Sequence, residues 1–281
     1  MNIKEITQQI KQRLKSKSPT PDLDTYLILS NVLKKSRLDL ILSQEQNISS
    51  SDLDRIEKYV QQRLNYVPIA YIIGNKEFYG REFITTPDVL IPRPETESII
   101  DIAKEHILND MSRSIWEIGT GSGCIAITLA AELQNLQIIA SDISHKALQV
   151  AKNNAIILLG VNHNITWLEG DLLTPFSNIK SEPNLLIANL PYLDPNKYQD
   201  DSISLEPDLA LYSNNNGLEH YMRLISEINS RFIVMPKIII EINPEQLDIL
   251  IEYLSKYFLK YEVKIFKDLQ GLDRHLLITP V

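Results

Sequence analysis

The sequence predicts an α/β fold in which a small helical bundle precedes a doubly wound, mostly parallel sheet. Two observations indicate this fold. The first 75 residues space their apolar side chains as helices do and contain no glycine before Gly74. From about residue 93 onward, short apolar segments alternate with helical patterns. The chain has 281 residues, 44% of them hydrophobic, which is enough for one large core or two smaller ones.

Two helix starts are visible in the N-terminal part. Thr20 precedes Pro21, which is typical of an N-cap followed by proline at the first helical position. Another helix is expected to start near Ser51, where SSDLDRIEKYVQQRL combines a capping serine, early acids and an apolar stripe. We therefore predict a helical domain over residues 1–75.

The segment KEFYGREFITTPDVLIP, residues 76–92, carries aromatic and β-branched residues around Gly80. This pattern predicts two short strands and a turn, a β-hairpin linker to a second domain over residues 93–281. The expected strands of that domain are SIWEI, LQIIA, ITWLE, NLLIAN, KIIIEI, YEVKIF and HLLITP. The first five are predicted to be parallel and covered on both faces, and the last two to form an antiparallel hairpin at the sheet edge.

Composition excludes several classes of protein. The formal net charge of −8 argues against a protein whose main task is to grip a nucleic-acid backbone. The single cysteine, Cys124, excludes an internal disulfide and a cysteine-built metal site, and with five scattered histidines no metal is expected. The polar N-terminus and the lack of a long apolar run predict a cytoplasmic protein without a membrane segment.

A glycine-rich loop, GTGSG, follows the strand SIWEI and opens a helix. Glycine there permits a tight turn and close approach of a ligand to the backbone. The next strand ends at Asp142, where a carboxylate can accept hydrogen bonds from both hydroxyls of a ribose. The predicted cofactor loop comprises Gly119, Thr120, Gly121, Ser122 and Gly123.

Two classes of cofactor satisfy this pattern. Dinucleotide enzymes place a pyrophosphate on a GxGxxG loop, but here Cys124 stands at the third glycine position. S-adenosylmethionine has no phosphate and needs only close approach to the main chain. Glu117 is then expected to bind its ammonium group through solvent or the loop. Asp171 would accept from the adenine amine, unless it only caps a turn, and Leu172 would pack on the ring.

The fourth strand ends in ANLPY, residues 188–192. The side-chain oxygen of Asn189 and the carbonyl of Leu190 can accept both hydrogens of a planar NH2 group, because Pro191 holds Leu190 extended. Tyr192 would lie against the face of that group. We predict that Asn189 and Tyr192 are catalytic and that Asn189, Leu190, Pro191 and Tyr192 bind the substrate. Asn189 is also predicted to contact the cofactor. The alternative is a strand end stopped by proline, with a surface tyrosine.

Over nearly its full length the chain resembles the release factor glutamine methyltransferases of the PrmC/HemK family. The resemblance rests on YIIGNKEFYGREF, LIPRPETE, EIGTGSG, ASDIS, IANLPY, LEPDLAL, NGLEHY, EINPEQ and DLQGLDR. It implies a Rossmann-like, S-adenosylmethionine-dependent methyltransferase sheet, seven-stranded and mostly parallel with the antiparallel edge hairpin. The family usually has Asn-Pro-Pro-Tyr; with Leu190 the carbonyl acceptor survives but the loop is expected to lose some rigidity.

The resemblance also implies the reaction and the partner. Methyl would pass from S-adenosyl-L-methionine, leaving S-adenosyl-L-homocysteine, to the glutamine side-chain amide of Gly-Gly-Gln in class 1 peptide chain release factors. The N-terminal helical domain would help to hold the release factor. No direct nucleic-acid or membrane partner is expected, and we expect a monomer.

Three further groups have open roles. Arg93 and Glu95 in RPETE could form an ion pair and helix cap with help from Thr96, or close over the methionine end of the cofactor. Glu241 ends a strand and is expected to act from behind the groups that touch ligands. The remaining group is predicted to form an N-cap, a first-turn proline and a capping-box partner: Asn243, Pro244 and Gln246.

Two other functions fit the same motifs. An adenine-N6 methyltransferase of DNA or RNA would use the same clamp on a planar NH2 group, although the acidic charge disfavours it. A non-catalytic cofactor-binding partner would need the loop but not the complete NLPY clamp. The sequence therefore favours the glutamine methyltransferase.

Overall fold

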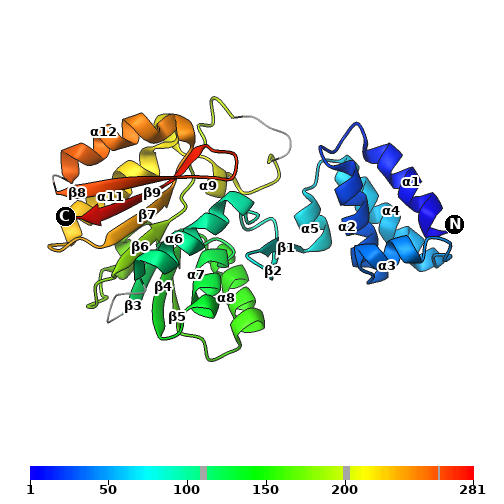
Figure 1. Ribbon diagram of the computed structural model, residues 1–281, viewed down its shortest axis with the longest axis horizontal. Coiled ribbons are helices and arrows are strands. Elements are labelled where there is room, and N and C mark those ends of the chain that lie inside the picture. Colours follow the sequence, from blue (N-terminus) through cyan, green and yellow to red (C-terminus); the bar gives the residue numbers. More distant parts are fainter. Residues whose placement is uncertain (108–112, 199–202, 259) are drawn as a thin grey trace. The chain divides into compact units, whose positions relative to one another are not determined.

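The structure is a computed structural model that describes residues 1–107, 113–198, 203–258 and 260–281. The described chain divides into two compact units (Figure 1). One consists mainly of Met1–Asn75, and the other of the chain from Lys76 onward, apart from a short stretch before Glu206. Each unit contains buried hydrophobic clusters of its own. The predicted limits at residues 75 and 92 remain predictions of domain boundaries.

Residues 1–75 form a helical bundle, as predicted. Its helices are α1 (Ile3–Leu14), α2 (Pro21–Leu33), α3 (Arg37–Leu42), α4 (Ser50–Leu64) and α5 (Ile69–Ile73). Pro21 starts α2 as expected, but the Thr20 side chain caps no backbone group and instead donates to Asp24. A buried ion pair from Arg63 Nε to Asp24 Oδ2, 2.5 Å long, ties α4 to α2.

The second unit begins with the predicted hairpin, β1 (Asn75–Phe78) and β2 (Arg81–Ile84). Phe78 and Phe83 are fully buried and pack edge to face, with ring centroids 6.1 Å apart. Both rings join a hydrophobic cluster that also contains residues of the main sheet. The hairpin is therefore packed onto this unit by its two aromatic side chains.

The main sheet has seven strands in the order β5-β4-β3-β6-β7-β9-β8, all within the described residues. They are β3 (Arg113–Ile118), β4 (Leu136–Asp142), β5 (Ile165–Glu169), β6 (Leu185–Ala188), β7 (Lys237–Glu241), β8 (Tyr261–Lys267) and β9 (Asp273–Pro280). The first five in sequence pair in parallel, and β9 runs antiparallel to both β7 and β8. The predicted sheet and edge hairpin are confirmed, with the last strand inserted inside the edge.

Helices cover both faces of this sheet (Figure 1). One face carries α6 (Ser98–Ile107), α7 (Cys124–Glu132) and α8 (His145–Leu159). The other carries α11 (Glu219–Arg231) and α12 (Leu247–Tyr257). Successive strand residues such as Ile115 and Trp116 belong to opposite cores, as expected for a strand buried on both faces.

Short helices and turns complete the unit and supply loops around the sheet's carboxyl edge. They are η1 (Pro94–Glu97), η2 (Thr174–Phe176), α9 (Asp208–Leu211), α10 (Asn214–Gly217) and η3 (Pro244–Gln246). Within the described ranges, every helix is too short or too polar to cross a membrane. The strand order reverses between β3 and β6, the point at which doubly wound sheets bind ligands.

Candidate active site

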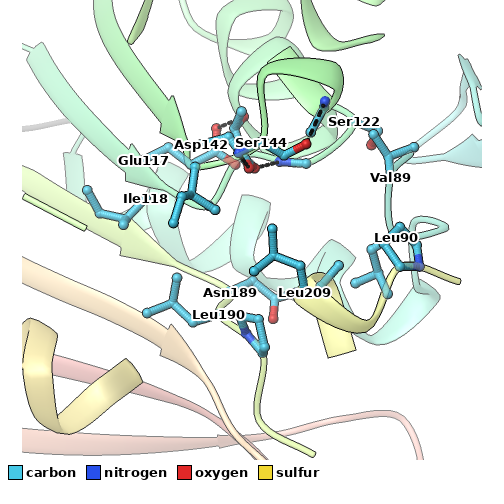
Figure 2. A pocket seen from close by; sticks show the side chains of 18 of the residues that line it. Val89, Leu90, Glu117, Ile118, Ser122, Asp142, Ser144, Asn189, Leu190 and Leu209 are labelled. Atoms are coloured by element: carbon cyan, nitrogen blue, oxygen red, sulfur yellow. Dashed lines mark hydrogen bonds between the residues drawn. The ribbon is translucent and has the colours of Figure 1, made fainter. Parts of the chain in front are cut away.

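A pocket opens at the carboxyl ends of the central parallel strands, at the reversal between β3 and β6. Figure 2 shows Asn189 and Leu190 on one side of it, and Asp142 and Ser144 on the other. Its lining contains most of the predicted site residues: Gly119, Thr120, Gly121, Ser122, Asp142, Asp171, Leu172, Asn189, Leu190 and Pro191. Gly123 and Tyr192 are not among the lining residues. The fold therefore brings GTGSG and NLPY to one cavity.

The glycines of the loop have different structural reasons. Gly119, Gly121 and Gly123 have φ values of 75°, 55° and 81°, in the left-handed region that side chains disfavour. A Cβ on Gly121 would meet nothing within 4 Å, so this position faces open space. A Cβ on Gly123 would lie 2.8 Å from Ile127 Cδ1 and 3.1 Å from Ala151 Cβ. Gly121 thus leaves room for a ligand, whereas Gly123 allows α7 and α8 to pack.

Asp142 fixes the glycine loop to the end of β4. Its Oδ2 accepts a hydrogen bond from Gly121 N at 2.8 Å, and its Oδ1 accepts one from Ser144 N at 2.9 Å. Burial raises the pKa of this carboxyl, against the opposing effect of those backbone donors. Because each carboxylate oxygen has more than one lone pair, both can still accept from a ligand. A role in holding ribose hydroxyls stays a prediction.

Glu117 lies beneath the loop and is almost completely buried. Its Oε2 accepts from Thr120 Oγ1 at 2.8 Å, but its Oε1 has no hydrogen-bond partner within the part of the chain that the structure describes. Burial raises the pKa of Glu117 to about 8. A buried acceptor without a donor is costly, so this atom fits a ligand that brings a donor or a positive charge into the pocket.

Asp171 and Leu172 line the pocket in different ways. The Asp171 carboxylate pairs with Arg223 of α11, and both side chains are about two-fifths exposed. Leu172 is buried and has a φ of 44°, an unusual backbone for leucine. The predicted contact of Asp171 with an adenine amine would have to share the carboxylate with Arg223, and it stays a prediction.

The side chain of Asn189 is held from behind by a carboxylate. Its Nδ2 donates to Glu241 Oε2 at 3.1 Å and to Thr96 Oγ1 at 3.2 Å, and the Thr96 hydroxyl donates to Glu241 Oε2 at 2.7 Å. A carboxylate only accepts, so the amide must turn its NH2 group toward Glu241. The amide oxygen is left to accept a hydrogen bond from a ligand.

Tyr192 is anchored to the same carboxylate. Its hydroxyl donates to Glu241 Oε1 at 3.1 Å, and burial, with the nearby charge of Glu241, raises the pKa of the phenol. Gln246 holds the other side of this residue, because its Nε2 donates to the Tyr192 carbonyl at 2.8 Å. The ring is therefore fixed at the hydroxyl and at the backbone. Its predicted place against the face of a substrate amide remains untested.

Glu241 is the shared partner of the motif, consistent with its expected place behind the ligand-contacting groups. It is 1% exposed, and a further buried side chain lies against it, His275. His275 Nε2 is 3.4 Å from Glu241 Oε2, and its Nδ1 is 3.0 Å from Ser98 Oγ. The sequence indicated no role for His275, because a single histidine near the start of a strand carries no distinguishing pattern.

The RPETE segment forms an ion pair, but with a distant partner. Arg93 Nη2 donates to Glu206 Oε1 at 2.5 Å, while Glu206 Oε2 accepts from Ile91 N at 3.1 Å. Arg93 provides no side-chain cap for η1, so the expected cap at this position is wrong. Thr96 turns inward to Glu241 instead.

The cap predicted in EINPEQ is confirmed. Asn243 accepts from Glu245 N at 3.2 Å, and Gln246 Oε1 accepts from Asn243 N at 3.1 Å, with Pro244 in the first turn of η3. The capping box thereby fixes Gln246, whose amide holds the Tyr192 carbonyl.

Comparison with known proteins identifies the class first. Residues 97–204 match the family described as methyltransferase small domain, and residues 5–74 match the PrmC N-terminal domain. Among solved structures, the hMettl16 catalytic domain in complex with a 3'UTR hairpin is similar, with a TM-score of 0.58 and 17% identity. That alignment covers 96% of this chain and 91% of the other, and at this identity it shows the fold alone. The chain has a methyltransferase fold.

Curated relatives identify the family. The chain is 36% identical to the release factor glutamine methyltransferase of Bacillus subtilis (strain 168), over 85% of this chain and 84% of that protein. It is 34% identical to that of Coxiella burnetii (strain RSA 493 / Nine Mile phase I), over 99% and 98%. The chain belongs to the family of release factor glutamine methyltransferases.

Some relatives are longer than this chain. The bifunctional methyltransferase of Rickettsia prowazekii (strain Madrid E) is 34% identical over 93% of this chain, which covers 54% of that protein. The chain thus spans about half the length of the bifunctional relatives that it matches.

Proposed function

We propose that this protein transfers a methyl group to the side-chain amide nitrogen of the glutamine in the Gly-Gly-Gln motif of class 1 peptide chain release factors. The observation that carries the proposal is the fixed orientation of Asn189. Its NH2 group is bonded to Glu241, so its oxygen is available at the carboxyl end of β6, beside the glycine-loop pocket.

The pocket residues fit S-adenosylmethionine as the methyl donor. Gly121 leaves open space beside the loop, and Asp142 offers carboxylate oxygens for hydroxyls. Glu117 has a buried oxygen that no described residue hydrogen-bonds, which suits a cationic or donor group. When bound, this cofactor supplies an electrophilic methyl group on a sulfonium. Burial raises the pKa of both Glu117 and Asp142, and a cationic ligand beside them would favour the charged carboxylates.

The chain's own part in the reaction is to hold the acceptor amide. Asn189 Oδ1 and the Leu190 carbonyl accept hydrogen bonds from the two N–H groups of the substrate amide. The nitrogen lone pair is thereby directed out of the plane of the NH2 group, toward the methyl group. The nitrogen gains a methyl group and loses one proton, which passes to solvent. Positioning and electrostatic support, rather than a dedicated base, supply the rate increase.

The test is methyl transfer from labelled S-adenosylmethionine to a purified class 1 release factor, with duplex DNA and a release factor lacking the glutamine as alternatives. We expect label only in the intact release factor. Asn189→Ala should lower kcat at least about 100-fold, because an acceptor of the reacting group is lost. The matched control is Asn153→Ala, an exposed asparagine on α8, with wild-type activity expected.

The alternatives give different results. Label in DNA alone would replace the proposal with an adenine-N6 methyltransferase. Cofactor binding without transfer to either substrate would indicate a non-catalytic binding protein. Unchanged turnover in Asn189→Ala would refute the amide clamp even if the release factor is methylated.

A further inference from the structure

Leu190 carries a backbone N–H just beyond the last paired residues of β6 and β7, and it lines the pocket. The strands pair in parallel up to Ala188 and Ile240, and Lys237 N donates to Asn184 O at the start of the pair. In a parallel pair the donors alternate between the two strands. With Leu185 opposite Lys237, this alternation makes Leu190 N–H the next donor beyond the paired residues, with the Glu241 carbonyl as its acceptor.

A phenol takes the place of that direct bond. Leu190 N donates to Tyr221 Oη at 3.1 Å, and the Tyr221 hydroxyl donates to the Glu241 carbonyl. Tyr221 belongs to α11 and is fully buried, so water does not compete for its hydroxyl. The two strand ends are therefore held apart by one side chain but remain linked through it.

The phenol lies closer to the Glu241 carbonyl than to the Leu190 carbonyl. Tyr221 Oη is 3.5 Å from this carbonyl, farther than from the Glu241 carbonyl, and a hydroxyl has a single hydrogen to donate. The hydrogen is used on Glu241. The Leu190 carbonyl, at a residue that lines the pocket, therefore keeps a lone pair for another donor.

The leucine side chain fixes the same residue from the other side. It is 5% exposed, and a Cβ on Gly119 would lie 3.0 Å from its Cδ2. The glycine therefore allows Leu190 to pack closely on the cofactor loop. Because leucine lacks a ring that restricts φ, its backbone depends on these contacts and on the N–H bond.

We propose that Tyr221 is a positioning residue that sets the Leu190 carbonyl as the second acceptor of the substrate amide. This inference rests on the proposed function for its catalytic consequence. In this role Tyr221 touches neither substrate nor cofactor. It acts by replacing a missing hydrogen bond between the two strands with two hydrogen bonds through its hydroxyl.

The test is a double-mutant cycle with Tyr221→Phe and Leu190→Pro. Tyr221→Phe should lower kcat about tenfold, with a smaller change in the KM for release factor, because one relayed hydrogen bond is lost. Proline removes the N–H and fixes φ itself. In the Leu190→Pro background, losing the hydroxyl should therefore change kcat less than about threefold. The same factor in both backgrounds would overturn the proposal.

The control is Tyr253→Phe, a tyrosine that packs against the same core and whose hydroxyl is 3.4 Å from the Met222 carbonyl. It should leave kcat unchanged. A second readout needs no activity: the Leu190 amide should exchange with solvent about tenfold faster in Tyr221→Phe than in the wild type. Unchanged exchange would contradict the relay, whereas wild-type protein without transferase activity would contradict only the proposed function.

Discussion

Replacing Glu241 tests whether a buried carboxylate orients the amide clamp. In the wild type it accepts from Asn189, Thr96 and Tyr192 at 3.1, 2.7 and 3.1 Å. Glu241→Ala removes the acceptor for all of these donors. The Asn189 amide is then free to turn over and present its NH2 group to a substrate that also brings donors.

The magnitude follows from one of those bonds. A hydrogen bond to a charged group contributes about 2 kcal/mol, and if only the bond to Asn189 is missing in the transition state, kcat falls about 30-fold. Folding is also affected, because buried donors lose their partner. The free energy of unfolding should fall by about 3 kcal/mol.

Glu241→Gln separates orientation from loss of an acceptor. If its amide oxygen occupies the Oε2 position, it keeps the bonds from Asn189 and Thr96. Its NH2 group then faces Tyr192, whose hydroxyl can rotate to accept instead of donate. We expect kcat within about fivefold of wild type, since the orientation of Asn189 is preserved.

The assay is steady-state methyl transfer to a release factor, with cofactor affinity from calorimetry and unfolding followed in parallel. The expected order of kcat is wild type, then Gln, then Ala. Equal rates for Gln and Ala would refute the orientation argument. Wild-type rates in a folded Ala variant would remove Glu241 from the site altogether.

Two other predictions concern the pocket. Burial raises the pKa of Glu117 to about 8. Its contribution to the free energy of unfolding is therefore full below the pKa of the unfolded chain and is lost as the pH rises through about 8. Glu117→Gln should remove this pH-dependent loss, which amounts to a few kcal/mol. Gly123→Ala places a Cβ 2.8 Å from Ile127 Cδ1 and should destabilise folding by about 2 kcal/mol, whereas Gly121→Ala, with nothing within 4 Å, should chiefly weaken cofactor binding. Equal losses of Tm in the two glycine variants, or a parallel pH curve for Glu117→Gln, would count against these assignments.

Local sequence patterns were sufficient to predict the sheet and the edge at which the candidate site lies. The apolar strands are marked by their own composition, and the capping box of Asn243 and Gln246 by a spacing of three residues. The reversal of strand order then places GTGSG and NLPY at one edge, since ligands bind at the carboxyl ends of parallel strands. Each of these inferences depends on residues close together in the sequence.

The contacts behind the motif were beyond such reasoning. Asn189 and Glu241 are 52 positions apart, Leu190 and Tyr221 are 31 apart, and Arg93 and Glu206 are 113 apart. Many carboxylates or hydroxyls could satisfy each donor equally well. Only the three-dimensional packing decides which of them is close enough, so Glu206 could not be identified from the sequence as the partner of Arg93.

The polar groups buried behind Asn189 and Tyr192 stabilise the folded protein less than apolar side chains in the same space could. Glu241 and His275 are 1% and 0% exposed, and His275 lies beside Ser98 of α6. Well-packed apolar residues are often as stabilising as a buried ionic pair, or more so. A polar group that folding does not need indicates a functional constraint. Filling the space with apolar side chains could therefore retain the fold while losing the orientation of Asn189, and this difference between stability and activity distinguishes a positioning network from a structural one.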